Sequence, residues 1–316
     1  MTARTAASSL VLGTWGLAGR GGLPRDRSYG DVTDTAAYET MDHAWEAGIR
    51  IVDTAPAYGA GEGLRRVGRW QQTRGRRWRI AAKPGRPHAQ HGPVSDLSLR
   101  GLMDEIECGT ELTDEPAYVL VKDPDARSYA DGSLAAALDS LEKRFPNLTI
   151  GVASHLPAAL ADFAASRLVG RTRVAQIELN AVNHRVAIPA AERLAACGWE
   201  VWAMQPLAYG FLAHPDLSPS PGADWRARIP ARTQATMRAA ARSFSRAVLT
   251  LRDAEPVVDL GSTDLAAWAI AFCLSVPAVA RTVIGPKNPA QLDAAIAALH
   301  IASNSDLSHR LCARMK

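Results

Sequence analysis

The sequence predicts one α/β domain over residues 1–316, a closed (β/α)8 TIM barrel, and three observations lead to this fold class. The chain has 316 residues, a length at which such barrels occur as one domain. Eight short apolar runs, rich in valine and isoleucine, recur along it. Longer segments follow these runs, and most of them repeat apolar residues at the spacing of an amphipathic helix. Eight strands that alternate with helices are typical of this barrel.

The expected strands are continuous apolar runs, as is typical of parallel strands that are buried on both faces. Each run ends in glycine, proline or a polar residue. In chain order the runs cover residues 8–16, 48–55, 78–84, 117–123, 148–154, 173–180, 200–207 and 281–285.

Capping residues mark several of the expected helices. The helical patterns cover residues 35–47, 133–144, 157–168, 188–197, 264–274 and 289–299. Gly48 follows the first pattern as a C-terminal cap, and Ser133 is the expected N-cap of the second. Thr263 and Asn288 are the expected N-caps of the last two patterns.

A long segment, residues 208–259, lies between the seventh strand and its helix. Loops of this length are usually functional or carry helices of their own. Residues 233–251 form such an extra helical pattern. We therefore expect the segment to shape the pocket at the top of the barrel.

Composition excludes several classes of protein. The chain has 36 basic and 32 acidic residues, a formal net charge of +4, and 47% hydrophobic residues. These values are ordinary for a globular protein and exclude a disordered chain. The basic excess is mild, and no reading motif or aromatic platform accompanies it. The sequence thus gives no sign of nucleic-acid binding, and we expect a small molecule as the partner.

The cysteines and the apolar stretches indicate a cytoplasmic protein. The four cysteines are far apart and form no CxxC pair, which argues against a zinc site and against a disulfide framework. No targeting segment is convincing. The most apolar late stretch, residues 265–284, is interrupted by Ser275, Pro277 and Arg281, so we expect no membrane span.

Polar residues at the ends of the second and third strands form the first candidate site, because barrel enzymes place their chemistry at the C-terminal strand ends. Asp53 ends the second apolar run, Tyr58 follows after a turn, and Lys83 ends the third run. Asp53 and Lys83 can form an ion pair at the rim. An ammonium beside a tyrosine favours the phenolate. Tyr58 is therefore expected to give a proton to a developing alkoxide and to take it back in the reverse reaction.

These residues lie in a segment that resembles a known family. Residues 48–62, GIRIVDTAPAYGAGE, are similar to the first signature of the aldo-keto reductases. Weaker matches follow the family's order along nearly the whole chain. They are LGTWG at 12–16, IAAKPG at 80–85, IGVASH at 150–155, QIELN at 176–180, QPL at 205–207 and VIGPKNP at 283–289.

The resemblance implies the family's barrel, its cofactor and its reaction. Family members bind NADPH, or less often NADH, and move a hydride between nicotinamide and a carbonyl carbon. The matching positions imply that NADP(H) is the cofactor, that Gln176 and Ser154 lie at its carboxamide, and that Lys287 meets the 2′-phosphate. Met204 takes the place of the ring that stacks on nicotinamide. The cofactor-binding residues expected on this basis are Ser154, Gln176, Met204, Gln205, Leu207, Gly285, Lys287 and Gln291.

The fourth strand departs from the family pattern. The family has a histidine there that orients the carbonyl oxygen, whereas this chain has Lys122 followed by Asp123. His155 belongs to the fifth strand and cannot simply replace it. A protonated Lys122 could donate a hydrogen bond to a carbonyl oxygen, and a neutral one could act as a base or form a Schiff base. Alternatively, Lys122 swings out to pair with Asp123 or Asp125.

Two functions therefore stay open. The first is an NADPH-dependent carbonyl reductase or alcohol dehydrogenase with catalytic residues Asp53, Tyr58, Lys83 and Lys122. The second is non-redox chemistry, such as elimination, epimerisation or imine formation, that uses Lys122, Tyr58 and Lys83. A binding or regulatory protein without turnover is a weaker third reading, because the Asp, Tyr and Lys are all present.

The substrate pocket is less determined by the sequence. Trp15, Tyr29 and His155 are the residues expected to line it. Their side chains leave the identity of the substrate open.

Overall fold

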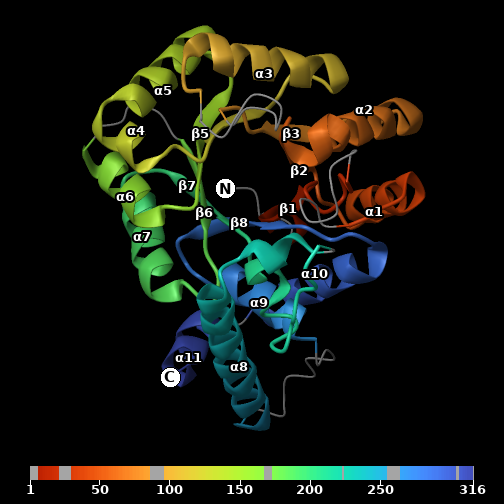
Figure 1. The fold of residues 1–316 in the computed structure, drawn as a ribbon, viewed down its shortest axis with the longest axis vertical. Helices are drawn as coiled ribbons and strands as arrows, with labels where there is room; N and C mark the ends of the chain where they lie inside the picture. The colour runs from red at the N-terminus through yellow and green to blue at the C-terminus, as the bar shows by residue number, and fades with distance from the viewer. Residues whose placement is uncertain are drawn as a thin grey trace.

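A closed barrel of eight parallel strands forms the centre of the computed structural model, which describes residues 6–20, 30–85, 96–166, 173–222, 224–254, 264–303 and 306–315. Each strand pairs with its neighbours in the chain, and β8 closes on β1 (Figure 1). The predicted fold class is therefore confirmed. The strands are β1 (Leu10–Gly13), β2 (Ile51–Thr54), β3 (Arg79–Ala82), β4 (Tyr118–Lys122), β5 (Thr149–Ser154), β6 (Val174–Glu178), β7 (Glu200–Met204) and β8 (Val279–Ile284).

Helices surround this barrel (Figure 1). They are α1 (Asp34–Glu46), α2 (Glu62–Arg74), α3 (Leu99–Leu112), α4 (Ala126–Ala130), α5 (Ser133–Arg144), α6 (Pro157–Ser166), α7 (His184–Ala196), α8 (Ala231–Ala254), α9 (Leu265–Leu274), α10 (Pro289–Ile301) and α11 (Leu307–Arg314). Within the described ranges, none of them combines the length and the apolar character that crossing a bilayer requires.

The strands are mostly shorter than the apolar runs that predicted them, because the runs continue into the turns that join strand and helix. Residues 48–50 show this. Gly48 has a φ of +90°, and the amide of Ile49 bonds to the carbonyl of Ala44, so this part of the run ends α1 before β2 begins. The eighth strand instead extends beyond its predicted run, since it begins at Val279 rather than at residue 281.

Two of the predicted helix caps are wrong. Gly132, in the left-handed conformation, caps α5, and Ser133 is the first helical residue. Asp264 rather than Thr263 caps α9, since its side chain accepts a hydrogen bond from the Ala266 amide at 2.8 Å. Thr263 lies outside the described residues. Asn288 caps α10 as predicted and accepts from the Gln291 amide at 3.0 Å.

Four helices of the structure, α2, α3, α4 and α11, have no counterpart among the predicted helices. Helix α2 buries Leu64, Val67 and Trp70, which recur at helical spacing. Its two internal glycines and four arginines obscure that pattern in the sequence. Arg69 and Arg74 lie exposed on the solvent face, as is usual for a helix that covers a barrel, whereas Arg66 is buried.

The long segment after β7 is partly helical, and the extra helix predicted over residues 233–251 is confirmed as α8. Before α8 the chain forms two short 3₁₀ turns, η4 (Ala208–Gly210) and η5 (Trp225–Arg228). Helix α8 projects away from the barrel beside α11 (Figure 1). Its Phe244 packs edge-on against Phe272 of α9, with ring centroids 6.4 Å apart. The segment is thus anchored on the outside of the barrel, while η4 and η5 lie nearer its mouth.

Gly68 allows α2 and α3 to pack closely, and its replacement provides a test of the packing. A Cβ at Gly68 would lie 1.7 Å from the Leu112 carbonyl oxygen, which is backbone and cannot turn aside. We expect Gly68→Ala to lower the free energy of unfolding by about 1–3 kcal/mol, measured by urea denaturation.

Gly109→Ala is the matched control, because it is also a helical glycine at this packing region. A Cβ there meets only the Leu64 side chain, at 3.9 Å. Alanine favours the helix by about 1 kcal/mol over glycine, so this variant should be as stable as the wild type or more so. Equal unfolding free energies for the two variants would contradict the packing described here.

Candidate active site

A cavity of about 1120 Å³ opens at the C-terminal ends of the strands. Its lining includes Asp53, Tyr58, Lys83 and Lys122 from the ends of β2, β3 and β4. It also includes the turn after β8, with Lys287. The predicted catalytic residues and the predicted phosphate-binding lysine therefore face one continuous space.

Asp53 and Lys83 form a buried ion pair at the bottom of this cavity. Lys83 Nζ lies 2.5 Å from Asp53 Oδ1, and their side chains are only 3% and 2% exposed. Gln176 Nε2 donates to the other Asp53 oxygen at 2.8 Å, so both oxygens of the carboxylate are bonded. Burial opposes the charge on Lys83, but Asp53 and Tyr58 outweigh it and raise the pKa of this lysine above its ordinary value. A permanent ammonium results.

Tyr58 faces this ammonium because of a tight turn after β2. Lys83 Nζ lies 5.0 Å from the centre of the Tyr58 ring. Tyr58 begins the 3₁₀ turn η3 (Tyr58–Gly61), in which Gly59 has a φ of +55°. A Cβ on Gly59 would lie 2.7 Å from the Ala18 carbonyl oxygen, so only glycine fits. Trp15 stacks on the Tyr58 ring, with ring centroids 6.2 Å apart.

Lys122 combines the two arrangements that the sequence left open. It pairs with Asp123, at 3.2 Å from Nζ to Oδ2, yet it stays in the cavity, where its side chain is 10% exposed. Its Nζ lies 5.8 Å from the centre of the Tyr58 ring. Asp125 does not take part, because its side chain caps α4 through the Ser128 amide.

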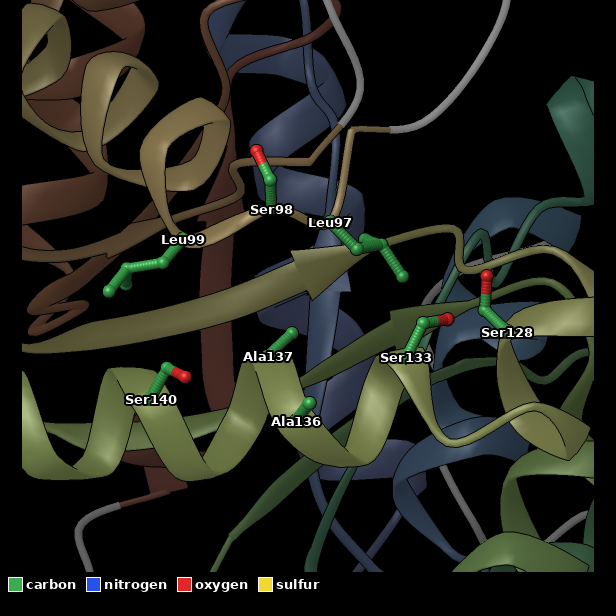
Figure 2. Close-up of a pocket in the computed structure, with 8 residues that line it drawn as sticks. All are labelled: Leu97, Ser98, Leu99, Ser128, Ser133, Ala136, Ala137 and Ser140. Carbon is green, nitrogen blue, oxygen red and sulfur yellow. The ribbon is translucent and has the colours of Figure 1, made fainter.

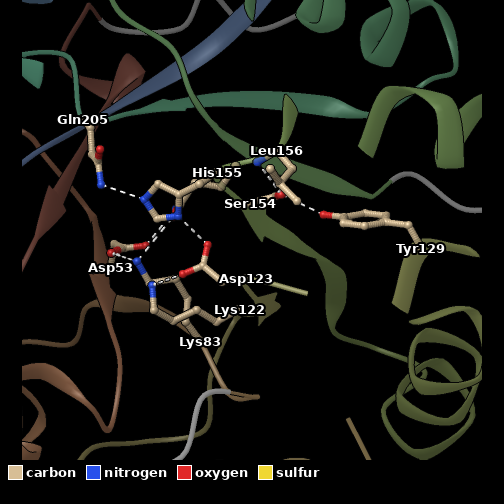
Figure 3. A network of polar contacts seen from close by, with 10 residues as sticks. Asp53, Lys83, Lys122, Asp123, Tyr129, Ser154, His155, Leu156 and Gln205 are labelled. Carbon is tan, nitrogen blue, oxygen red and sulfur yellow. Dashed lines mark hydrogen bonds and ion pairs between the residues drawn. The ribbon is translucent and has the colours of Figure 1, made fainter. Parts of the chain in front are cut away.

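His155 joins the same group of residues from β5 (Figure 3). Its Nδ1 lies 2.5 Å from Asp123 Oδ1, and its Nε2 lies 2.8 Å from Gln205 Nε2. The sequence indicated only that His155 and Lys122 belong to different strands. The structure shows that β4 and β5 are paired neighbours, so the two side chains reach one carboxylate.

Ser154, which was expected at the cofactor, does not face the cavity. Ser154 is fully buried, accepts from Tyr129 Oη at 2.7 Å, and points away from the cavity (Figure 3). It is not part of the cavity lining and instead holds α4 against β5. Tyr29 lies outside the described residues. Trp15 and His155 line the cavity as expected.

The remaining residues expected at the cofactor all line the cavity, namely Gln176, Met204, Gln205, Leu207, Gly285, Lys287 and Gln291. Gln291 Oε1 accepts from the Lys287 amide at 2.9 Å and so holds the turn before α10. Burial lowers the pKa of Lys287, and the nearby Arg226 adds to this effect while Asp224 opposes it.

Arg226 is the cationic residue at the cavity that the sequence did not reveal. It belongs to η5, lines the cavity, pairs with Asp224 at 2.6 Å and donates to the Tyr209 carbonyl at 2.9 Å. Only five of the 36 basic residues of the chain are lysines, and the others are arginines. Nothing in the sequence therefore distinguishes this one arginine, in a long insertion, from the many others. Its position beside Lys287 comes only from the folding of that insertion.

The lining suits a nicotinamide dinucleotide. Pockets for drug-sized ligands usually measure about 300–1,000 Å³, so about 1120 Å³ leaves room for a dinucleotide with part of a small substrate. The donor set also fits. A carboxamide side chain, Gln176, lies beside the Asp53–Lys83 pair, and two cations, Lys287 and Arg226, lie where they could neutralise a phosphate.

A second cavity of about 410 Å³ lies outside the barrel, between the start of α3 and α5 (Figure 2). Its lining consists of serine, leucine and alanine side chains. Among the described residues that line it, none carries a carboxylate, an imidazole or an amine. Over all the residues that the structure describes, no cluster of three or more His, Cys, Asp or Glu side chains could hold a metal ion.

Comparisons with known proteins show what the chain is similar to. A D-threo-aldose 1-dehydrogenase of a Pseudomonas species is 30% identical over 135 aligned positions, which cover 35% of this chain and only 41% of that relative. A glycerol dehydrogenase of Gluconobacter oxydans superposes with a TM-score of 0.70 at 19% identity, over 97% of this chain and 90% of its own.

A second solved structure is similar to the same extent. The holo form of an aldo-keto reductase from Bacillus halodurans has a TM-score of 0.67 at 18% identity, over 98% of this chain and 92% of its own. At these identities the two solved structures support the fold alone. The family model described as aldo/keto reductase family matches residues 9–312. This match covers nearly the whole chain, and the protein belongs to the aldo/keto reductase family.

Proposed function

We propose that the protein is an NADP(H)-dependent oxidoreductase that moves a hydride between nicotinamide and a carbonyl or alcohol carbon. One observation carries the proposal. A single cavity is lined both by Tyr58 with the buried Asp53–Lys83 pair and by Lys287 with Arg226. Family membership supports a nicotinamide cofactor. Titration of the protein with NADPH, followed by nucleotide fluorescence, tests it, and an absence of binding would contradict it.

The chain's own residues supply the proton chemistry. A bound nicotinamide supplies or accepts the hydride. Tyr58 gives its phenolic proton to the carbonyl oxygen as that oxygen gains negative charge, and takes the proton back when an alcohol is oxidised. The Lys83 ammonium stabilises the phenolate that remains. Asp53 holds Lys83 in place, and Gln176 holds Asp53.

Lys122 orients the substrate oxygen in this proposal. Its ammonium carries three N–H donors, and the ion pair with Asp123 leaves donors that can be directed into the cavity. A hydrogen bond from a charged donor also stabilises a developing alkoxide. An ammonium that is paired with a carboxylate has no lone pair to attack a carbonyl carbon. This geometry favours the redox reading over imine formation.

We propose polyhydroxylated carbonyl compounds or alcohols as the substrate class. A relative is named for aldose oxidation and a structural neighbour for glycerol oxidation. The aromatic residues of the cavity add support. The centroid of the Trp15 ring lies 6.5 Å from that of Tyr209 and 5.3 Å from that of Trp225. These aromatic faces offer apolar surface for the carbon side of a polyol, while Lys122 and His155 offer polar groups for its oxygens.

Replacement of Lys122 separates the two readings. We expect Lys122→His to keep or raise the rate of NADPH-dependent carbonyl reduction, because imidazole also donates to a carbonyl oxygen. Lys122→Met should lower kcat/KM about 10- to 100-fold, the effect of losing one charged hydrogen-bond donor. Steady-state kinetics with an aldose or a simple aldehyde measure both.

Lys143→Met is the control, because this lysine lies exposed on α5 and far along the chain from the cavity lining. It should leave the kinetics unchanged. If Lys122→His were as inactive as Lys122→Met, the reaction would need a lysine amine. That result would favour non-redox chemistry over hydride transfer.

A further inference from the structure

One carboxylate, that of Asp123, is shared by two groups that face the cavity. Its Oδ2 is 3.2 Å from Lys122 Nζ, and its Oδ1 is 2.5 Å from His155 Nδ1. Lys122 and His155 both line the cavity, whereas Asp123 lies behind them and is 14% exposed. The carboxylate therefore couples the two cavity groups, because both of them bond to the same single negative charge.

Backbone strain maintains this arrangement. Asp123 has a φ of +44° and Gln205 a φ of +57°, both in the left-handed region that residues other than glycine rarely adopt. These two residues hold the two ring nitrogens of the same histidine. Strain of this kind is usually kept at functional sites. The strain therefore indicates that the fold fixes the position of the His155 imidazole.

The contacts of His155 suit both of its protonation states. Gln205 donates from Nε2 to His155 Nε2, so that nitrogen is the acceptor and Nδ1 carries the proton toward Asp123. Gln205 Oε1 is buried and has no hydrogen-bond partner. Rotation of this amide by half a turn would place Oε1 against His155 Nε2, where the oxygen would accept a hydrogen bond from an imidazolium N–H. The site thus already holds an acceptor for the charged form.

We infer that His155 is a positioning residue for Lys122, and that by taking up a proton it draws the Asp123 carboxylate to itself and releases the Lys122 ammonium toward the substrate oxygen. The proton comes from solvent and binds His155 Nε2, and no covalent bond changes. The inference rests on the proposed function only in that Lys122 meets the substrate. His155 is a group that the Tyr58–Lys83–Asp53 chemistry does not use.

The charges around His155 come from the neighbouring strand ends. Lys122 and Asp123 belong to the end of β4, and Glu178 ends β6. Burial opposes ionisation of Asp123, but the hydrogen bond from His155 and the charge of Lys122 hold the pKa of its carboxyl well below the usual range. Burial raises the pKa of Glu178, and His155 opposes that shift. Asp123 therefore stays ionised and can stabilise an imidazolium, with Glu178 as a weaker second acid.

Two variants should change the pH profile in opposite directions. In the wild type we expect kcat/KM for carbonyl reduction to be about tenfold higher below the His155 titration than above it, the effect of one charged hydrogen bond. His155→Gln keeps a donor for Asp123 but cannot titrate, so it should stay at the lower value from pH 5 to 8. Asp123→Asn removes the carboxylate that restrains Lys122 and should stay at the higher value.

A purely structural role would give another result. Both variants would then lose activity by similar factors at every pH, and that outcome would overturn the inference. His43→Gln is the matched control, because His43 forms the same kind of contact with Asp293, at 2.7 Å, on the exposed surface between α1 and α10. Its pH profile should equal that of the wild type.

NMR of the full chain without nucleotide gives a readout that needs no turnover. The chain has eight histidines and five lysines, so ¹⁵N-histidine and ¹³Cε-lysine spectra are simple enough to assign with His155→Gln and Lys122→Met. We expect the Lys122 signal to shift with the same pH midpoint as the His155 ring. In Asp123→Asn the Lys122 signal should no longer follow the titration of the His155 ring, because the carboxylate that joins the two groups is lost.

The two kinds of failure are distinguishable. If His155 titrates and Lys122 does not follow, the coupling is absent and the inference is wrong, whatever the enzyme does. If NADPH fails to bind while Lys122 and His155 titrate together, the proposed function is wrong and the coupling stands.

Discussion

Tyr58→Phe is expected to lower kcat for carbonyl reduction by about 10²- to 10⁴-fold, the usual contribution of a positioned general acid. The phenylalanine ring keeps the stacking on Trp15 and the shape of the cavity but has no proton to give. In the wild type Lys83 Nζ lies 5.0 Å from the centre of the Tyr58 ring. In the variant Lys83 would keep its charge but would have no phenolate to stabilise. Steady-state kinetics with NADPH and an aldehyde measure the change, and the nucleotide should still bind.

Tyr118→Phe is the matched control for this experiment. Tyr118 is also a buried tyrosine of the barrel, but it starts β4 and packs against Trp202, with ring centroids 5.0 Å apart. It is absent from the cavity lining. Loss of its hydroxyl should leave kcat within a factor of a few. If Tyr58→Phe kept full activity while the control behaved as expected, Tyr58 would not be the acid.

Lys287→Met is expected to weaken NADPH binding about 10- to 100-fold and to change NADH binding little. The 2′-phosphate of NADPH is the only difference between the two nucleotides, and a charge-assisted hydrogen bond to a phosphate contributes about 1.5–3 kcal/mol. Lys287 lines the cavity beside Arg226, so the remaining arginine limits the loss. Fluorescence titration with both nucleotides gives the two dissociation constants.

The ratio of the two constants decides the interpretation. We expect the wild type to bind NADPH more tightly than NADH, and the variant to lose most of that preference. An equal loss for both nucleotides would mean that Lys287 stabilises the turn before α10 rather than the phosphate. Lys143→Met on the surface of α5 should leave both constants unchanged.

The barrel could be predicted because its signals are local. A parallel strand buried on both faces shows as a short apolar run, and all eight runs correspond to observed strands. The helices were less visible. Helix α2 places Gly63 and Gly68 inside a helix, because the Leu112 backbone passes too close for any side chain at Gly68. Such a contact with α3 leaves no trace in the local pattern.

The clustering of the candidate site residues could also be predicted in large part. Asp53, Tyr58 and Lys83 stand at or just after strand ends, and consecutive strand ends of a barrel are neighbours in space. Ser154 shows where this reasoning stops. It also ends a strand, but its hydroxyl faces Tyr129 and not the cavity. Side chains alternate between the two faces of a strand, and the register that decides the face is set by pairing partners far along the chain.

The sequence by itself determined the fold class, the Asp53–Tyr58–Lys83 cluster and the presence of Lys122 where the family has histidine, because each depends on residues close together in the chain. Only the tertiary structure decided where Lys122 points, that His155 shares Asp123 with it, and that Arg226 stands beside Lys287. These contacts join different strands and a long insertion. Their geometry depends on barrel closure and on strained backbone at Asp123 and Gln205, which no local pattern of residue types encodes.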